Sequence, residues 1–177
     1  MTQKKLKKNI KVVLGDICYP KSEALIIPGN TKGITNRGIL DKIVKYEWRE
    51  IRQQLKEIAT ENKVEIGDIL TTDPGKFKRR GVIKVYHCII KRLISDYTSL
   101  NIVENVVNKV FKQVIDDYMN SVTICGIGIE QGDLDPRSVA RITCGVCNKY
   151  KHYIKIMIID HNIEFINECN KILEDSN

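Results

Sequence analysis

The sequence predicts an α/β protein in which helices cover a mixed, largely parallel β-sheet. Six short runs rich in β-branched residues recur along the chain, at residues 11–14, 24–27, 69–72, 82–90, 121–125 and 154–159. Longer segments with helical periodicity separate several of these runs. Strands that alternate with helices are typical of layered α/β domains.

Four segments carry the apolar period of an amphipathic helix, namely residues 38–60, 98–118, 136–148 and 161–173. Their apolar residues recur close to every 3.6 positions, so we assign them to the core and not to function. Thr98 or Ser99 can cap the second helix. Pro136 follows Asp135, which suits an N-cap residue and a proline at the first helical position.

Length, composition and charge fit a single domain spanning residues 1–177, with a basic N-terminal arm at residues 1–10. No apolar run approaches the ~20 residues of a membrane helix, and we expect a cytoplasmic protein without a membrane partner. The net charge of +7 is scattered, and 6% aromatic residues are too few for a base-stacking platform. A solvated basic surface is therefore favoured over nucleic-acid binding. A smaller anionic ligand such as a nucleotide is compatible with such a surface.

The six cysteines predict neither a metal site nor a cofactor. Without a secretory signal they are expected to be reduced thiols. Cys144 and Cys147 form the only close pair, and a structural zinc site needs two more ligands. The pair falls within a predicted helix, where small thiols pack well against a core.

Four loops rich in glycine or turn residues follow predicted strands, at residues 15–17, 28–38, 73–75 and 126–133. Ligands of open α/β sheets bind at the carboxyl ends of the strands. The second and fourth loops place glycines before a helix, where free N–H groups favour a phosphate. Neither loop is a P-loop or a dinucleotide fingerprint. Two phosphate-type loops and Asp16 after the first strand predict a nucleotide diphosphate ligand.

The order of these motifs resembles the macrodomains, a family of ADP-ribose-binding modules. Residues 15–17 read GDI, and residues 23–30 read EALIIPGN where the family has DAIVNAAN. Residues 36–43 (NRGILDKI) stand where the family has GGGVDxAI, and residues 67–71 correspond to GDxxxT. A strand that ends in His87 and a GxG loop at residues 126–128 complete a resemblance over residues 11–160.

The resemblance implies a three-layer αβα sandwich with a cleft for ADP-ribose or an ADP-ribosylated protein. It assigns the adenine amino group to Asp16, with the Ile17 backbone beside it, and the distal ribose to Asn30. The two diphosphate loops would be formed by Arg37, Gly38 and Ile39 and by Gly126, Ile127, Gly128 and Ile129. An arginine in the first loop can pair with a phosphate, or it can be a solvated loop residue.

The resemblance leaves open whether the protein only binds its ligand or also hydrolyses the ADP-ribosyl linkage. Leu40 stands where some hydrolytic members carry an acidic residue, and Asp41 lies one place later. Glu130 matches the acidic position of a branch that cleaves ADP-ribose from carboxylates, and Asp133 is close to it. Glu130, Asp133 and Asn30 are therefore the catalytic candidates, although either acid can instead be a surface or capping carboxylate. The alternative is a basic nucleic-acid-binding or non-catalytic interaction domain on the same fold.

Overall fold

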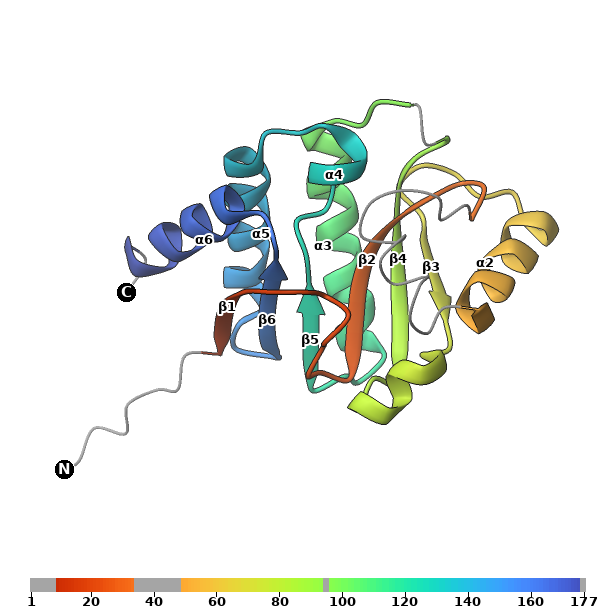
Figure 1. The fold of residues 1–177 in the computed structure, drawn as a ribbon, viewed down its shortest axis with the longest axis horizontal. Helices are drawn as coiled ribbons and strands as arrows, with labels where there is room; N and C mark the ends of the chain where they lie inside the picture. The colour runs from red at the N-terminus through yellow and green to blue at the C-terminus, as the bar shows by residue number, and fades with distance from the viewer. Residues whose placement is uncertain (1–8, 34–48, 94–95, 176–177) are drawn as a thin grey trace.

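The computed structural model describes residues 9–33, 49–93 and 96–175, which form one six-stranded sheet with helices on both sides (Figure 1). The strands are β1 (Ile10–Leu14), β2 (Ala24–Asn30), β3 (Ile69–Thr72), β4 (Lys84–Lys91), β5 (Ser121–Ile124) and β6 (Lys155–Asp160). All six predicted strands are confirmed. The helices are α2 (Arg49–Glu61), η1 (Gly75–Arg80), α3 (Leu100–Asp116), α4 (Ile129–Gly132), α5 (Pro136–Tyr150) and α6 (Ile163–Asp175).

The strand order is β1-β6-β5-β2-β4-β3, in which every neighbouring pair is parallel except β3 with β4. The predicted mixed, largely parallel sheet is therefore confirmed. Five strands direct their carboxyl ends to one edge of the sheet. Because β3 runs the other way, the loop that follows it at residues 73–75 lies at the opposite edge. That loop cannot contribute to a site at the carboxyl ends, which corrects its place among the four candidate loops.

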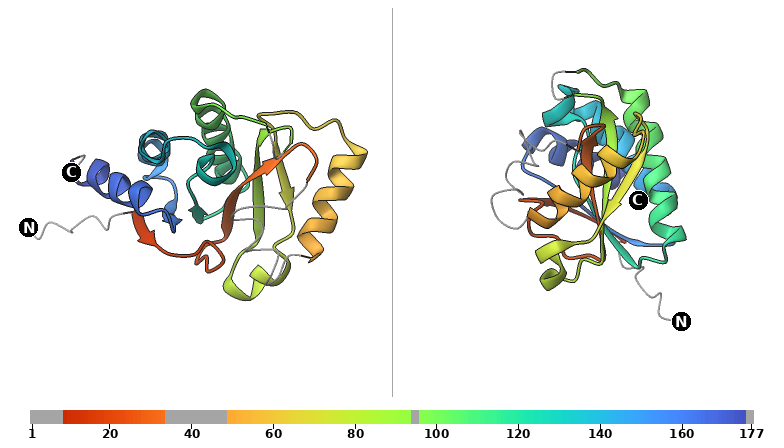
Figure 2. Two further views of the ribbon diagram at one scale, coloured as in Figure 1. Left: turned by 45° about the horizontal axis from the view of Figure 1, so that its top comes forward. Right: turned by 90° about the vertical axis from the view of Figure 1, so that its right-hand side faces the viewer.

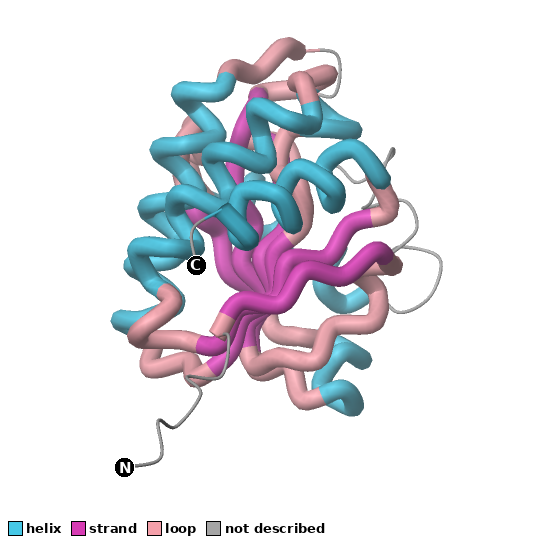
Figure 3. The backbone as a smooth tube through the Cα atoms, turned by 90° about the vertical axis from the view of Figure 1, so that its left-hand side faces the viewer, coloured by secondary structure: helices cyan, strands magenta, loops and turns pink. Residues whose placement is uncertain are grey.

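The helices form the outer layers of the sandwich. Helix α3 packs against β4 and α5, α5 packs against α6, and α6 reaches β1. Helix α2 packs against β3 near the other edge of the sheet and lies on the opposite side from α3 (Figure 2). Seen from the β1 edge, the sheet is twisted and the larger helices are stacked along one of its sides (Figure 3). Of the helices in the described part of the chain, none has the length and apolar character to cross a bilayer.

The predicted helix signals act as expected. The Ser99 side chain accepts a hydrogen bond from the Ile102 amide and caps α3, and Asp135 caps α5 through the Ser138 amide with Pro136 in the first turn. The predicted helix at residues 38–60 is described only from Arg49 onward, so its first part lies outside the described residues. The short helices η1 and α4 were not predicted, because one or two turns are too short to show a period.

Strand β2 continues to Asn30, although the sequence assigns Pro28 to a loop. Strand β5 pairs with β2 only as far as Ile26, so beyond that residue β2 has a partner on one side, in β4. Proline is tolerated at such an edge because its missing N–H is not needed. The register shifts between Gly29 and Asn30, and Asn30 then pairs with Lys91 of β4.

The core holds most of the described stripe residues and all six cysteines, but Ile163, at the start of the predicted stripe of residues 161–173, is 55% exposed and does not belong to it. The central part of the α3 stripe is fully buried, including Val106, Val110 and Phe111, whereas Ile102 and Ile115 at its ends are half-buried. Cys144 and Cys147 lie in α5 and are buried, as the packing interpretation of the pair predicts. Within the described residues no group of three His, Cys, Asp or Glu side chains could hold a metal ion.

Candidate functional site

The carboxyl ends of the parallel strands carry most of the polar residues that the sequence singles out. Along this edge, Asp16 follows β1, the loop that begins at Gly126 follows β5, and Asn30 ends β2. The strand order places the loop between the other two residues. Neighbouring strands are about 4.8 Å apart, so β1 and β2 are separated by roughly 14 Å. The predicted residues for base, diphosphate and distal ribose thus lie along the edge in their chemical order.

Asp16 is exposed and Ile17 beside it is buried. One carboxylate oxygen of Asp16 accepts a hydrogen bond of 2.8 Å from the Cys18 amide. This short turn fixes the carboxylate at the end of β1 and leaves it accessible to solvent. A fixed and exposed acceptor suits recognition of an amino group.

Asn30 is buried, with 3% of its surface exposed. Its Oδ1 accepts a hydrogen bond of 3.1 Å from the Lys32 amide. The chain beyond Asn30 is tied to β4, because the Thr31 amide donates to the Lys91 carbonyl at 3.1 Å. Asn30 is therefore held firmly where β2 and β4 end.

The loop after β5 has a backbone that requires glycine. A Cβ at Gly126 would overlap the Ile129 side chain and would lie 3.2 Å from the Asp160 carboxylate. Gly128 has a φ of +96°, a left-handed conformation that other residues rarely adopt. The Ile127 side chain is buried and anchors the loop in the core. The predicted members of this loop thus form one compact turn at Gly126, Ile127 and Gly128, which leads into α4 at Ile129.

A buried aspartate joins the loops after β1, β5 and β6, the first through its backbone carbonyl and the other two through its carboxylate. Asp160, the last residue of β6, is 3% exposed, and its Oδ2 accepts a hydrogen bond of 2.9 Å from the Gly126 amide. Its Oδ1 accepts a hydrogen bond of 2.8 Å from the Asn162 amide, and its carbonyl accepts the Gly15 amide at 2.9 Å. The structure therefore brings the GDI turn and the fourth loop together through a residue that the sequence analysis did not select.

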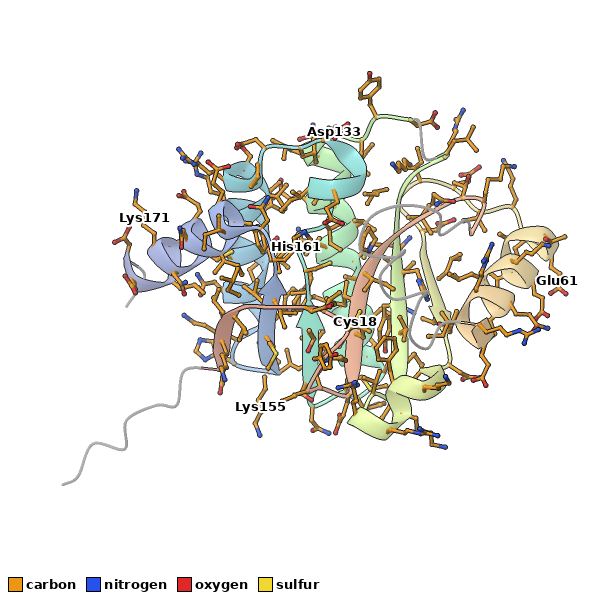
Figure 4. The ribbon with its side chains drawn as sticks, in the orientation of Figure 1. Cys18, Glu61, Asp133, Lys155, His161 and Lys171 are labelled. Carbon is orange, nitrogen blue, oxygen red and sulfur yellow. The ribbon has the colours of Figure 1, made fainter. Side chains whose placement is uncertain are left out.

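His161 connects this carboxylate to a catalytic candidate. Its Nε2 lies 2.5 Å from a carboxylate oxygen of Glu130, and its Nδ1 lies 3.6 Å from Asp160. Figure 4 shows His161 near the head of β6 and Asp133 farther along, beside α4. The imidazole thus contacts Glu130, which lies in the first turn of α4.

The second acidic candidate, Asp133, ends α4 in a left-handed conformation with a φ of +51°. Its charge favours the protonated form of Lys91, as does that of Asp96, but burial has the larger effect and lowers the pKa of Lys91. Lys91 is 2% exposed and pairs in register with Asn30. A desolvated lysine gives up its proton more readily than an exposed one and is then a better nucleophile.

Two other titratable groups near this edge are unsuited to proton transfer or nucleophilic attack. His87 lies inside β4 and not at its end, its Nε2 is 3.0 Å from the Thr72 hydroxyl, and burial lowers its pKa to about 3. Burial also raises the pKa of Cys125 well above the ordinary value, so its thiol stays protonated.

Asp160, His161 and Lys91 are the site residues that sequence reasoning missed. Asp160 and Lys91 each end an apolar strand run, which is the same signal that selected Asp16. Arg37, Gly38 and Ile39 were predicted for the first diphosphate loop and lie outside the described residues, as do Leu40 and Asp41.

A sequence profile of the family described as Macro domain matches residues 27–143. The chain belongs to the macrodomain family, which confirms the resemblance seen in its motifs. The match begins after the GDI motif and does not include Asp16 and Ile17. Their assignment to the adenine therefore depends on the resemblance of the GDI motif and on their position after β1.

Solved macrodomains share the fold at low sequence identity. The macrodomain of Mycobacterium tuberculosis DarG superposes with a TM-score of 0.76 at 18% identity, covering 85% of this chain and 96% of that one. A Trypanosoma brucei macrodomain in complex with ADP-ribose gives 0.75 at 13% identity, covering 93% of this chain and 69% of that one. An uncharacterized protein of Aquifex aeolicus (strain VF5) is 24% identical, over 93% of this chain and 98% of its own.

Proposed function

We propose that this macrodomain binds ADP-ribose, free or attached to a protein, along the carboxyl edge of its sheet. The observation that carries the proposal is the order of Asp16, the Gly126 loop and Asn30 along that edge. In the proposed pose the Asp16 carboxylate accepts a hydrogen bond from the adenine amino group, and the Ile17 amide lies beside it. The Gly126 loop directs backbone amides at the diphosphate, and the Asn30 side chain forms a hydrogen bond with the distal ribose. The Trypanosoma brucei complex with ADP-ribose supports the ligand class.

Calorimetric titration with ADP-ribose and with AMP tests this proposal. We expect ADP-ribose to bind more tightly than AMP, because AMP lacks the second phosphate and the distal ribose. Asp16→Ala removes a charged acceptor, and such hydrogen bonds are worth about 1.5–3 kcal/mol, so affinity should fall roughly tenfold or more. Asp73→Ala is the matched control, since Asp73 lies in the loop at the opposite edge. Absence of heat with ADP-ribose at millimolar concentration would reject the function.

We propose further that the site hydrolyses the ADP-ribosyl linkage, releasing ADP-ribose and the unmodified acceptor at the expense of one water. Glu130 is oriented by His161 and is the candidate to activate the water or protonate the leaving group. The charge of Asp133 acts on Lys91, which pairs in register with Asn30. In a covalent route the neutral amine of Lys91 would attack the distal ribose carbon as the bond to the acceptor breaks and the acceptor takes up a proton, and water would then cleave the Lys91–ribose bond to release ADP-ribose.

Release of ADP-ribose from a mono-ADP-ribosylated protein distinguishes a hydrolase from a binding module. Glu130→Gln, Asp133→Asn and Lys91→Met are compared with the unchanged protein, each with its ADP-ribose affinity measured separately. Substitution of a catalytic residue should lower the rate of ADP-ribose release at least about a hundredfold, which is the typical contribution of a general acid or base. If all three variants bind and turn over as the unchanged protein does, the assignment of these groups is wrong.

A second candidate function, nucleic-acid binding, is supported by a cavity at the amino ends of the strands, opposite the proposed ADP-ribose site. This cavity of about 380 Å³ lies at the amino ends of β1, β5 and β6 and includes Lys11, Lys21 and Lys155 in its lining. Affinity for an oligonucleotide should then fall steeply with salt. Charge reversal at Lys155 should weaken such binding without changing the affinity for ADP-ribose.

A further inference from the structure

A basic pocket adjoins the place where the distal ribose would lie. Its volume is about 540 Å³, within the range of ligand sites. The lining residues come from the segments that follow β2, α2 and β4, namely Thr31, Lys32, Lys63, Val64, Glu65, Ile66, Arg92 and Leu93. No residue of this set belongs to the ADP-ribose site proposed above.

The wall of this pocket is bonded directly to the proposed ribose site. The Lys32 amide donates to Asn30 Oδ1 at 3.1 Å, and the Thr31 hydroxyl donates to the Arg92 carbonyl at 3.1 Å. Arg92 directly follows Lys91 in the chain. In the strand order, β4 lies beyond β2 as seen from β1, so the pocket continues the line of base, diphosphate and ribose. The next chemical group along that line is the acceptor to which ADP-ribose is attached.

We propose that this pocket is the acceptor subsite and that it takes an acidic peptide segment around the modified side chain. This inference rests on the proposed ADP-ribose binding and names the substrate class of the same site.

The charges in the pocket fit an acidic partner. Lys63 is already paired with Glu65 at 2.8 Å. Lys32 and Arg92 form no ion pair with any carboxylate of the described residues. Two cations at the exit of the ribose site would attract carboxylates that flank the modified residue and speed their encounter with the site.

The apolar part of the lining favours a peptide over a nucleic acid. Ile66 and Leu93 are 37% and 45% exposed, so aliphatic side chains face solvent in this pocket. Among the described residues that line the pocket none is aromatic, and stacking on aromatic rings is the main apolar contact of single-stranded nucleic acids. Aliphatic walls with two cations match a peptide that carries acidic residues and an apolar side chain.

The test measures the affinity of four ligands for the full chain by calorimetry. The ligands are ADP-ribose, a peptide with acidic flanks carrying ADP-ribose through a non-hydrolysable linkage, the same peptide with basic flanks, and an oligonucleotide carrying ADP-ribose. We expect the acidic peptide to bind about fivefold or more tighter than ADP-ribose, because exposed ion pairs contribute up to about 1 kcal/mol each. The basic peptide and the oligonucleotide should gain nothing.

The double variant Lys32→Glu/Arg92→Glu should keep the affinity for ADP-ribose within about twofold and reverse the preference between the acidic and basic peptides. The matched control Lys78→Glu/Lys171→Glu changes the net charge equally, at exposed positions of η1 and α6 that do not line the pocket, and should keep the preference. If ADP-ribose binds and the peptides do not differ, the acceptor subsite is wrong and the proposed function stands. Tightest binding of the oligonucleotide also overturns the acidic-peptide assignment. If ADP-ribose itself does not bind, both fail.

Discussion

The buried carboxylate of Asp160 is predicted to stabilise the loops that surround the candidate site. It accepts backbone hydrogen bonds of 2.9 Å from Gly126 and 2.8 Å from Asn162, and it is 3% exposed. Asp160→Asn keeps the shape and one acceptor oxygen, but it turns an NH₂ group toward one of these N–H donors. One charge-assisted hydrogen bond is then lost, at about 1.5–3 kcal/mol, and an unpaired buried donor is left behind. We expect a loss of about 2–4 kcal/mol in the free energy of unfolding.

Urea unfolding followed by circular dichroism measures this loss. With a slope of about 2 kcal/mol per molar urea, the midpoint should fall by roughly 1–2 M. Asp135→Asn is the control, because asparagine caps a helix as well as aspartate does, and its midpoint should hardly move. The affinity for ADP-ribose should fall together with the stability, since the Gly126 loop loses its anchor. A midpoint shift below about 0.25 M for Asp160→Asn would refute this role of the carboxylate.

Two further predictions concern the loop after β5 and a buried histidine. Gly126→Ala places a methyl group against Ile129, and it should lower the free energy of unfolding by about 1–3 kcal/mol and the ADP-ribose affinity roughly tenfold. The control Gly145→Ala lies at an open helical position and should raise the free energy of unfolding by about 0.5–1 kcal/mol. Equal ADP-ribose affinity in the two variants would contradict the assignment of the Gly126 loop to the ligand. Burial lowers the pKa of His87 from 6.5 to about 3, so the native state favours the neutral imidazole. The stability that depends on neutral His87 is therefore complete above pH 6.5. As the pH falls toward 3, the free energy of unfolding decreases by up to about 1.4 kcal/mol per pH unit. Unfolding measured from pH 7 to 4 should show a shallower decline for His87→Gln, and identical slopes would contradict this prediction.

Local patterns predict most of the elements but not where they lie. The strands are recognisable because each is a short β-branched run, and α3 and α5 because a 3.6-residue stripe coincides with a capping residue. The order of the motifs along the chain is enough to indicate the family. The four-residue helix α4 was missed because it holds too few residues for periodicity and owes its start to the backbone of Gly128.

The sequence by itself determined that strands and helices alternate, that glycines and polar residues follow the strands, and that the motifs run in macrodomain order. Only the tertiary structure decided which strands are neighbours, because pairing depends on contacts between distant segments. The antiparallel direction of β3 removed one candidate loop, and the placement of β6 between β1 and β5 set Asp160 between two glycine turns. Lys91 became a candidate site residue for the same reason, since its pairing with Asn30 joins residues that are 61 positions apart in the chain.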